Sequence, residues 1–517
     1  MKILPIGTQS FSKLIEENKI YIDKTEHIYN LIRNGSVYFL SRPRRFGKSL
    51  LISTFKELFK GNKKVFEGLY IYDKWDWSKT NPVIHLDFTE LGYSSINVLN
   101  NSLEDFIIRT AMQYSIELIS RGTPDKFAEL IEKMHKVIGQ QVVILVDEYD
   151  KPLIDNLSKE EIYPEVKRTL HDFYQVIKAS DEHLRFVFLT GVSQFSGLSI
   201  FSGLNNLNNI TMNAKYTSIC GYTQEELENN FKEYIESSAE VMGIPREEVL
   251  SAIKRWYNGY SWDGETFVYN PFSTLVFFDN KKFANYWFKT GTPTFLIEQI
   301  RKRDELEIFT KPKIVGEDSL NGLDYDKIES TALLFQTGYL TIKKEESTEL
   351  GLQYELDFPN MEVRNAFITN VLEYYSNGQS REINRIRVNL GKQIKGKDEK
   401  GLEESLKILF AHIPSNLHIS LEAYYHSMLM MLMMAVGYEV EGEVNTDKGR
   451  IDAVLKKGKE VIVVEIKHGK GSKIEKLLKE GLAQIKEKKY YEKYEEKEVS
   501  LLAIAFGENK EIGCKFE

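Results

Sequence analysis

The stretch SRPRRFGKSL, residues 41–50, ends in residues that could bind phosphate. Gly47, Lys48 and Ser49 match the last three letters of G-x-x-x-x-G-K-[ST]. In that motif backbone N–H groups surround the phosphates, the lysine reaches the terminal phosphates, and the hydroxyl binds Mg²⁺. The position of the first glycine holds Arg42 instead. Because an arginine lacks the backbone freedom of glycine, this loop has to close in a different way.

A second motif, VVILVDEYD from Val142, ends an apolar run with Asp147 and Glu148. At the end of a buried strand, Asp147 could hold the water shell of Mg²⁺ and Glu148 could polarise an attacking water. The alternative is an acidic strand end that faces solvent. Because the motif follows G-K-S by about 100 residues, the pair favours a nucleotide site. At the end of the next strand, Thr190 and Ser193 either sense the γ-phosphate or form a simple turn.

Near the C-terminus, GRIDAVLKKGKEVIVVEIKHG contains Asp452, Glu465 and Lys467. An aspartate and an E-x-K pair on adjacent strands are typical of metal-dependent phosphodiesterases, in which carboxylates bind Mg²⁺ and the lysine orients or activates water. Glu465 and Lys467 are two residues apart, so they project from the same face of a strand. The alternative, an exposed charged hairpin with a salt pair, explains Lys467 but poorly explains two carboxylates bordered by apolar residues.

The register of this hairpin can be counted. If Gly458 and Lys459 form a two-residue loop of type II′, Lys457 pairs with Glu460. Continuing in that register places residue 452 directly opposite residue 465, on one face of the sheet and about 4.5–5.5 Å away between Cβ atoms. One metal ion could bridge two carboxylates at that spacing, and a cation would be needed to keep both of them charged.

Four short apolar runs position the residues of the first half. Each is rich in β-branched and aromatic residues and lacks alternation, which is typical of strands buried on both faces. The runs are VYFLSRP from Val37, VIHLDF from Val83, VVILVDEYD from Val142 and RFVFLTGVS from Arg185. Helical spacing between them, as in SLLISTFKELFKG, predicts a doubly wound parallel sheet with its ligand at the carboxyl ends of the strands.

Changes of pattern divide the chain into four predicted parts. They are a parallel-sheet domain over residues 1–219, a small helical lid over 220–290, a helical, winged-helix-like connector over 291–400 and a final α/β domain over 401–517. In the lid, Thr223 and Glu226 form a capping-box signature, and Gly259 can stop a helix. The connector shows the order helix, strand, strand, helix. The polar, charged run of residues 391–401 resembles a linker.

The composition is that of an ordinary globular protein: of 517 residues, 42% are hydrophobic and 28% are charged. A net charge of −8 provides no overall basic field, so any surface for nucleic acid is local. Cys220 and Cys514 form no disulfide framework or metal-site spacing, which suits a reducing compartment. The N-terminus lacks the apolar run of a signal peptide, and residues 428–436 are far short of the ~20 residues of a membrane span. We expect a cytoplasmic protein without membrane contact.

Six stretches carry a resemblance that spans nearly the whole chain. They are YIDKTEHI, FLSRPRRFGKSL, ILVDEYDKPL, LTGVSQFSGLSIFSGLNNL, WYNGYSW and VYNPFS. With them the chain resembles the AAA-ATPase-like proteins of bacteria and archaea that bear a C-terminal PD-(D/E)XK nuclease domain. The loop of that family reads RPRRFGKS, so Arg42 is the family's own variant of a P-loop NTPase. Arg44 and Arg45 either add positive charge near the phosphates or are solvated.

The resemblance implies the residues that hold ATP and Mg²⁺. For the loop they are Arg44, Arg45, Phe46, Gly47, Lys48 and Ser49, with Asp147 and Glu148 as the Walker B acids. For the last domain, which is restriction-endonuclease-like, the resemblance adds Glu422, at the start of a Met-rich helix, to the metal site. Gln484 and Tyr490 match a pattern on the helix after the E-x-K strand, where the alternative is the polar edge of an amphipathic helix. His468 is expected on the surface rather than as a ligand.

Lysines crowd the helix that follows the E-x-K strand. They are Lys470, Lys473, Lys476, Lys479, Lys486, Lys488 and Lys489. This cluster either contacts a phosphate backbone or, with the interleaved glutamates, forms salt pairs on an exposed helix.

These patterns predict an ATP-binding, ATP-hydrolysing protein coupled to a metal-dependent nuclease that cuts DNA. Mg²⁺ is expected at both sites, with Mn²⁺ as an alternative at the nuclease site, and the resemblance adds a role in mobile-element or anti-invader biology. The rival hypothesis is a nucleotide-binding regulatory protein whose nuclease-like domain binds nucleic acid or a partner without cleavage. The sequence leaves open the choice of DNA or RNA, an arginine finger, and the oligomeric state, a homo-oligomer included.

Overall fold

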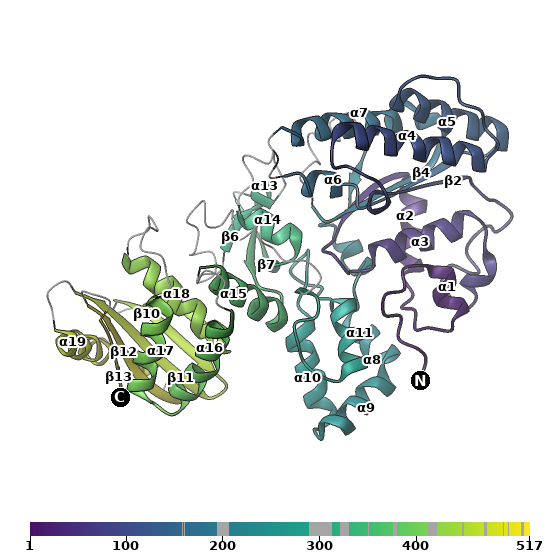
Figure 1. Cartoon of the computed structure of the whole chain (residues 1–517). Coiled ribbons are helices and arrows are strands. Elements are labelled where there is room, and N and C mark those ends of the chain that lie inside the picture. Colours follow the sequence, from purple (N-terminus) through teal and green to yellow (C-terminus); the bar gives the residue numbers. More distant parts are fainter. Residues whose placement is uncertain are drawn as a thin grey trace. The chain divides into compact units, whose positions relative to one another are not determined.

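The chain folds into two compact units, Met1–Thr290 with Ile314–Met361, and Gly291–Lys313 with Glu362–Glu517. The computed structural model describes residues 1–157, 159, 161–193, 206–288, 313–320, 330–349, 351–375, 380–411, 421–446, 449–469, 473–489, 491–494, 496–507 and 511–517. Within these ranges, only the backbone is described at 374–375, 380–383, 411, 421–425, 443–446, 449 and 493. Figure 1 shows the elements of both units.

A five-stranded parallel sheet frames the first unit. Its strands are β1 (Val37–Ser41), β2 (Val83–Asp87), β3 (Val142–Asp147), β4 (Leu184–Gly191) and the short β5 (Asn208–Asn209). Their order is β2–β3–β4–β1–β5, and every ladder is parallel. The predicted parallel sheet and its four apolar strands are therefore confirmed. Because β3, β4 and β1 are adjacent and parallel, their carboxyl ends lie at the same end of the sheet.

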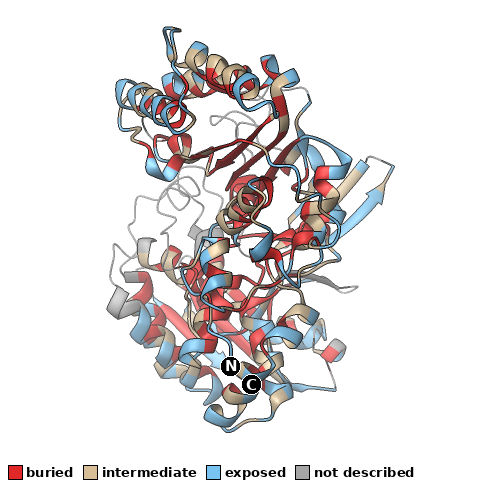
Figure 2. Cartoon of the chain, turned by 90° about the vertical axis from the view of Figure 1, so that its right-hand side faces the viewer, coloured by how far each residue is buried: buried red, intermediate tan, exposed pale blue. Residues whose placement is uncertain are grey.

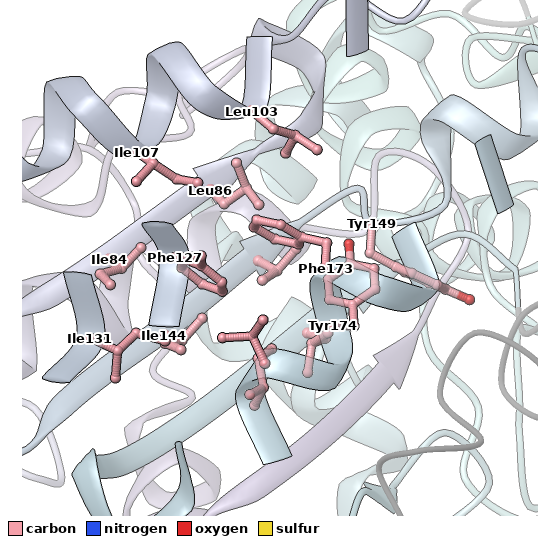
Figure 3. Packing of buried hydrophobic residues seen from close by; sticks show 14 of the residues in the cluster. Ile84, Leu86, Leu103, Ile107, Phe127, Ile131, Ile144, Tyr149, Phe173 and Tyr174 are labelled. Carbon is pink, nitrogen blue, oxygen red and sulfur yellow. The ribbon is translucent and has the colours of Figure 1, made fainter. Parts of the chain in front are cut away.

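Helices cover both faces of this sheet. They are α1 (Phe11–Glu16), α2 (Thr25–Asn34), α3 (Lys48–Phe59), α4 (Ile96–Gln113), α5 (Thr123–Ile138), α6 (Lys151–Ile154) and α7 (Tyr163–Ala179). On one face Ile84 of β2 shares a buried cluster with Phe127 of α5 and residues of α4 and α7 (Figure 3). On the other face the ring of Phe55 from α3 lies 5.1 Å from that of Phe186. The strands are consequently buried on both sides (Figure 2).

A helical region follows, as the sequence predicts for the lid. Its helices are α8 (Gln224–Asn230), α9 (Lys232–Met242), α10 (Arg246–Tyr257) and α11 (Pro271–Asn280), which share one buried cluster. The predicted capping box is present: the hydroxyl of Thr223 accepts from the Glu226 amide, and the Glu226 carboxylate accepts from the Thr223 amide. After α10, Gly259 takes a φ of +97°, so this glycine lies at the predicted helix stop.

The predicted connector is divided between the two units. Its elements are β6 (Lys313–Gly316), α13 (Glu317–Leu320), α14 (Ser330–Thr337), β7 (Thr341–Thr348), β8 (Gly351–Asp357) and α15 (Met361–Tyr375), which include the predicted order helix, strand, strand, helix. The β7–β8 hairpin belongs to the first unit because the lid holds it: the Ser261 amide donates to Thr341 Oγ1 at 2.7 Å. From Glu362 onward α15 belongs to the second unit. The domain boundaries expected at residues 290 and 400 stay predictions.

The second unit combines helices with a mixed sheet. Its further helices are α16 (Ser380–Lys395), α17 (Glu399–Ala411), α18 (Leu421–Ala435) and α19 (Ile474–Glu487). Its strands are β9 (Glu439–Thr446), β10 (Gly449–Lys457), β11 (Glu460–His468), β12 (Glu498–Phe506) and β13 (Ile512–Phe516), in the order β13–β12–β11–β10–β9. The pair β11–β12 is parallel and is connected through α19, whereas the other pairs are antiparallel. The sequence did not predict β9 and β13.

The prediction of a linker at residues 391–401 is wrong. These residues belong to the end of α16, a tight turn and the start of α17, and Ile394 and Leu402 are buried. The charged residues occupy exposed faces of two amphipathic helices, which a purely compositional interpretation mistakes for a linker.

The Met-rich run lies on α18, where Met428, Met430 and Met431 are fully buried as core residues. Across the described ranges, each helix is too short or too polar to cross a membrane.

Candidate functional site

The phosphate-type loop lies between β1 and α3, as the sequence predicts. β1 ends at Ser41 and α3 begins at Lys48. Between them, Gly47 caps the helix with a φ of +94°, a left-handed value that favours glycine. The first amides of α3 are therefore available at a helix N-terminus, where backbone donors and the helix dipole favour an anion.

A cavity of about 360 Å³ lies at this helix N-terminus. It is lined by the predicted residues Arg44, Arg45, Gly47, Lys48, Ser49 and Glu148. Its volume falls within the range of small-ligand sites, ~300–1,000 Å³. The structure therefore brings most of the predicted loop residues and one predicted acid to a single pocket.

Sequence reasoning missed the other residues that line this cavity, and two groups of them lie far from the loop in sequence. They are Pro5, Gly7, Thr8 and Gln9 of the N-terminal segment and Tyr222, Pro271, Phe272 and Leu275 of the lid. Distance along the chain concealed them, because they lie far before and far after the loop. The stretch VYNPFS, which contains Pro271 and Phe272, was a signal for them, although no role could be assigned to it from the sequence.

Arg42, at the position of the first motif glycine, does not line the cavity. It is fully buried, and its guanidinium donates to the carbonyls of Ser41, Thr211 and Tyr216 at 2.8, 2.9 and 3.1 Å. The same group lies 3.7 Å from the ring centroid of Trp262 in the lid. Burial lowers the pKa of Arg42 to about 10, which leaves it charged at neutral pH. A buried cation thus fixes the base of the loop where the motif usually relies on glycine.

Phe46 requires a correction. The sequence assigned it to the ATP site, but its side chain is buried and is absent from the cavity wall. Its ring packs edge-on against Tyr260 and Trp262, with centroids 4.7 and 5.7 Å away. An apolar ring between charged neighbours gains more by burial against the lid aromatics than by facing phosphates. Phe46 therefore anchors the loop.

Lys48 contacts both the loop and the acidic strand end. Its Nζ donates to the carbonyls of Arg42 and Pro43 at 3.0 and 3.2 Å, and lies 3.4 Å from Glu148 Oε1. Asp147 is buried beside these groups and accepts a hydrogen bond from Thr190 Oγ1 at 2.6 Å. Burial raises the pKa of Asp147, and hydrogen bonds from Ser49 and Thr190 oppose that rise. The hydroxyl and the acid of the two motifs therefore lie together, as a Mg²⁺ site of this type requires.

The segment after Glu148 is fastened to the end of β4. Asp150 is fully buried and accepts from the Val192 amide at 3.1 Å, and from the amide and hydroxyl of Ser193 at 2.7 and 2.6 Å. Burial, followed by the charge of Glu148, raises the pKa of Asp150 to about 6. Thr190 and Ser193 thus bond Asp147 and Asp150, and neither is part of the cavity wall. Of the two sequence alternatives, the structure supports a structural role for both residues.

The β10–β11 hairpin has the predicted register near its turn. Lys457 pairs with Glu460, and the ladder continues to the pair Ala453 and Val464. Gly458 has a φ of +62°, whereas Lys459 lies outside the left-handed region, as a type II′ turn requires.

Beyond that point the ladder departs from the prediction at Asp452. Instead of forming a backbone pair opposite Glu465, Asp452 accepts the Ile466 amide on its Oδ2 at 2.7 Å. The two strands therefore part where the carboxylates lie. The two carboxylates still interact, since the charge of Asp452 contributes to the pKa of Glu465.

Glu465 is the most buried acid of this site, with 2% of its surface exposed. Burial, followed by the charge of Asp452, raises its pKa to about 6. Lys467 donates to Glu465 Oε1 at 2.9 Å and to Gln484 Oε1 at 2.7 Å. The other carboxylate oxygen, Oε2, is buried and has no hydrogen-bond partner among the described residues. The predicted Glu465, Lys467 and Gln484 thus form one connected cluster that lacks a partner for one oxygen.

Other predicted residues of this domain fall outside the described side chains. The structure describes the backbone of Glu422, which belongs to α18, but not its side chain. Tyr490 lies outside the described residues. Within the described part, no group of three His, Cys, Asp or Glu side chains forms a metal site. The ring of His468 is stacked on Phe506, with centroids 5.0 Å apart.

Comparison with known proteins identifies the family of this chain. A family model described as a predicted AAA-ATPase matches residues 5–201, and a model of the PD-(D/E)XK nuclease superfamily matches residues 420–516. The chain belongs to the AAA-ATPase-like proteins with a C-terminal PD-(D/E)XK nuclease superfamily domain. The predicted family is thus confirmed. The first matched region contains Lys48, Ser49 and Glu148, and the second contains Asp452, Glu465 and Lys467.

The chain is similar to the following two proteins, among others. An uncharacterized protein in the vnfD 5′ region of Azotobacter chroococcum is 37% identical over 515 residues, which cover 98% of this chain and 96% of that protein. A solved structure of the Aeropyrum pernix ORC2 protein, in ADPNP–ADP complexes, is 13% identical over 65% of this chain and 87% of that chain, with a TM-score of 0.25.

Proposed function

We propose that this AAA-ATPase-like protein binds and hydrolyses ATP in the first unit and cleaves DNA with a metal-dependent nuclease site in the second. The ATP half rests on the cavity at the N-terminus of α3, which Lys48, Ser49 and Glu148 line together. The nuclease half rests on the buried Glu465 oxygen that has no partner among the described residues. A cytoplasmic location and a role in mobile-element or anti-invader biology belong to the same proposal.

The ATP site is suited to a triphosphate by its charge. Arg44, Arg45 and Lys48 line the cavity, so three cations can face the phosphates in a chain of net charge −8. Bound Mg²⁺ would supply charge neutralisation between the β- and γ-phosphates, and Ser49 with Asp147 would hold it. Glu148 lies at the cavity wall as the acceptor that orients the attacking water.

Two substitutions test this half. Lys48→Ala should weaken ATP binding at least about tenfold, because it removes the cation nearest Glu148 and the loop carbonyls. Glu148→Gln should keep ATP binding and abolish hydrolysis. Calorimetry of nucleotide binding and a phosphate-release assay measure the two effects. Equal ATP affinity of the native protein and Lys48→Ala would remove the ATP site, whereas ATP binding without hydrolysis by the native protein would support the binding-only rival.

The residues of the second site fit a divalent cation. Two carboxylates, Asp452 and Glu465, lie close enough to interact, and a cation would give Glu465 Oε2 the partner that the described residues do not provide. When bound, Mg²⁺ or Mn²⁺ would stabilise charge on the scissile phosphate. Lys467 is held by Glu465 and Gln484, so its ammonium is oriented to position or activate water.

Cleavage assays decide between the enzyme and its rival. Asp452→Ala and Lys467→Ala should abolish metal-dependent cleavage of DNA and leave ATP binding unchanged, because the substitutions lie in another unit. RNA of the same sequence and omission of ATP serve as the two comparisons. Unchanged cleavage by Asp452→Ala would refute the nuclease site, and nucleic-acid binding without cleavage by the native protein would favour the regulatory alternative.

A further inference from the structure

His426 lies at the nuclease site although no motif of the sequence includes it. It belongs to α18, and its Nε2 lies 3.1 Å from the backbone carbonyl of Asp452 on β10. A carbonyl oxygen only accepts hydrogen bonds, so the imidazole must be the donor through Nε2–H. The half-buried His426 side chain therefore joins a helix directly to the strand residue that carries a predicted metal ligand.

The ladders around Asp452 show where β10 stops pairing with β11. On the β9 side, the pairs Ile451 with Val444 and Ala453 with Gly442 flank Asp452. On the β11 side, the ladder ends one residue earlier, at Ala453. The carbonyl of a strand residue normally bonds the neighbouring strand. The Asp452 carbonyl additionally accepts from the imidazole of His426 on α18.

The side chain of Asp452 is anchored as well. Its Oδ2 accepts the Ile466 amide, which in a continued register would face Ile451. Asp452 is thus fixed at two points, the carbonyl by His426 and the carboxylate by the backbone of β11. With both points fixed, the position of this carboxylate beside Glu465 is set before any cation arrives.

We propose that His426 is a positioning residue of the metal site: it holds the Asp452 backbone where the β10–β11 ladder ends, so that the Asp452 and Glu465 carboxylates can bind one divalent cation. The inference rests on the metal site of the proposed function. Groups that orient metal ligands typically contribute about 10–100-fold to metal affinity or activity. His426 also lies one helical turn after position 422, so the same contact fixes α18, the helix that carries the predicted ligand Glu422, against β10.

The test measures the binding of Mn²⁺ to the full chain by calorimetry, in the absence of nucleotide. His426→Leu should weaken Mn²⁺ affinity about tenfold or more, because leucine fills the space but donates no hydrogen bond. His426→Gln should restore most of that affinity, because its amide can donate to the same carbonyl. Asp452→Ala marks complete loss, and His171→Leu on α7 is the matched control that should leave Mn²⁺ binding unchanged. Unchanged thermal unfolding confirms that each variant is folded.

The outcomes separate this inference from the nuclease proposal. Native Mn²⁺ affinity in His426→Leu, or an equal loss in His426→Leu and His426→Gln, would overturn the positioning role while the metal site stands. Absence of Mn²⁺ binding by the native chain would overturn the metal site and the inference together. If the native chain cleaves DNA, the metal concentration for half-maximal cleavage should rise in His426→Leu, with rate largely recovered at saturating metal.

Discussion

In the first unit the buried carboxylates Asp147 and Asp150 accept hydrogen bonds from hydroxyl or amide groups, whereas in the second unit one oxygen of the buried Glu465 has no such donor among the described residues. The cationic side chains of the two sites also differ in their surroundings. Arg42 is fully buried and binds backbone carbonyls at the base of the loop, whereas Lys467 is half-buried and donates to Glu465. The buried carboxylates of the first site therefore have donors, whereas the second site leaves one carboxylate oxygen without a donor in the described part of the chain, which is where the proposed cation would bind.

The largest expected effect is the loss of the cation beneath the loop. Arg42→Gly restores the usual phosphate-loop motif in the sequence, yet we expect it to destabilise the first unit by roughly 3 kcal/mol or more. Three carbonyls lose their donor, at about 1 kcal/mol or more each, and the stacking on Trp262 is lost. ATP affinity should fall at least about tenfold. Calorimetric unfolding and ATP titration measure both quantities.

Arg45→Gly is the matched control for stability. Arg45 has a φ of +66°, which glycine adopts without strain, so this substitution should leave the unfolding temperature of the first unit nearly unchanged. If Arg42→Gly were as stable as Arg45→Gly, the buried guanidinium would not be the group that closes the loop.

A smaller loss is expected from Asp150→Asn. Asparagine keeps one acceptor oxygen, but its NH2 group would face the Val192 amide, which donates to both oxygens of Asp150, so stability at pH 5 should fall by about 1–2 kcal/mol. The pKa of Asp150 is raised from 3.8 to about 6, so its contribution to stability is present below pH 3.8 and is lost as the pH rises through about 6. The advantage of the native protein over Asp150→Asn should therefore shrink between pH 4 and pH 7. A constant difference across denaturation curves in that range would contradict the assignment.

The smallest expected effect on stability is a gain, in contrast to the losses above. Glu465→Gln should stabilise the metal-free second unit at pH 7–8 by about 1 kcal/mol, because the raised pKa of about 6 means that the ionised form is disfavoured in the folded state. The same substitution should abolish Mn²⁺ binding. Thermal unfolding without metal, compared with unfolding in excess Mn²⁺, measures both results. A destabilised metal-free variant would show that Glu465 is already satisfied without a cation.

Local patterns predicted the frame of both sites. Four apolar runs gave the strands of the parallel sheet, and the Gly458-Lys459 turn gave the hairpin register as far as Ala453. These features depend on residues close in sequence, such as a turn glycine or a β-branched run. The register count failed only at Asp452, where a side chain rather than the backbone accepts the next amide.

Contacts between distant segments could not be predicted in the same way. The burial of Arg42 depends on carbonyls at positions 211 and 216 and on Trp262, and no spacing rule connects them. The role of His426 depends likewise on a strand that follows it by 26 residues. The expected linker failed for another reason, because the composition of residues 391–401 conceals the buried Ile394, and the buried Leu402 follows directly after them.

The glycine that follows α10 has a mechanical consequence. A Cβ at Gly259 would lie 2.0 Å from the carbonyl oxygen of Pro359, and the side chain of Asn360 donates to the Asn258 carbonyl at 2.8 Å. Met361 is the last residue of the first unit before the chain enters the second. The segment after α10 is therefore packed directly against the last residues of the first unit. A side chain at position 259 would displace the Pro359 carbonyl and so disturb the last residues of the first unit.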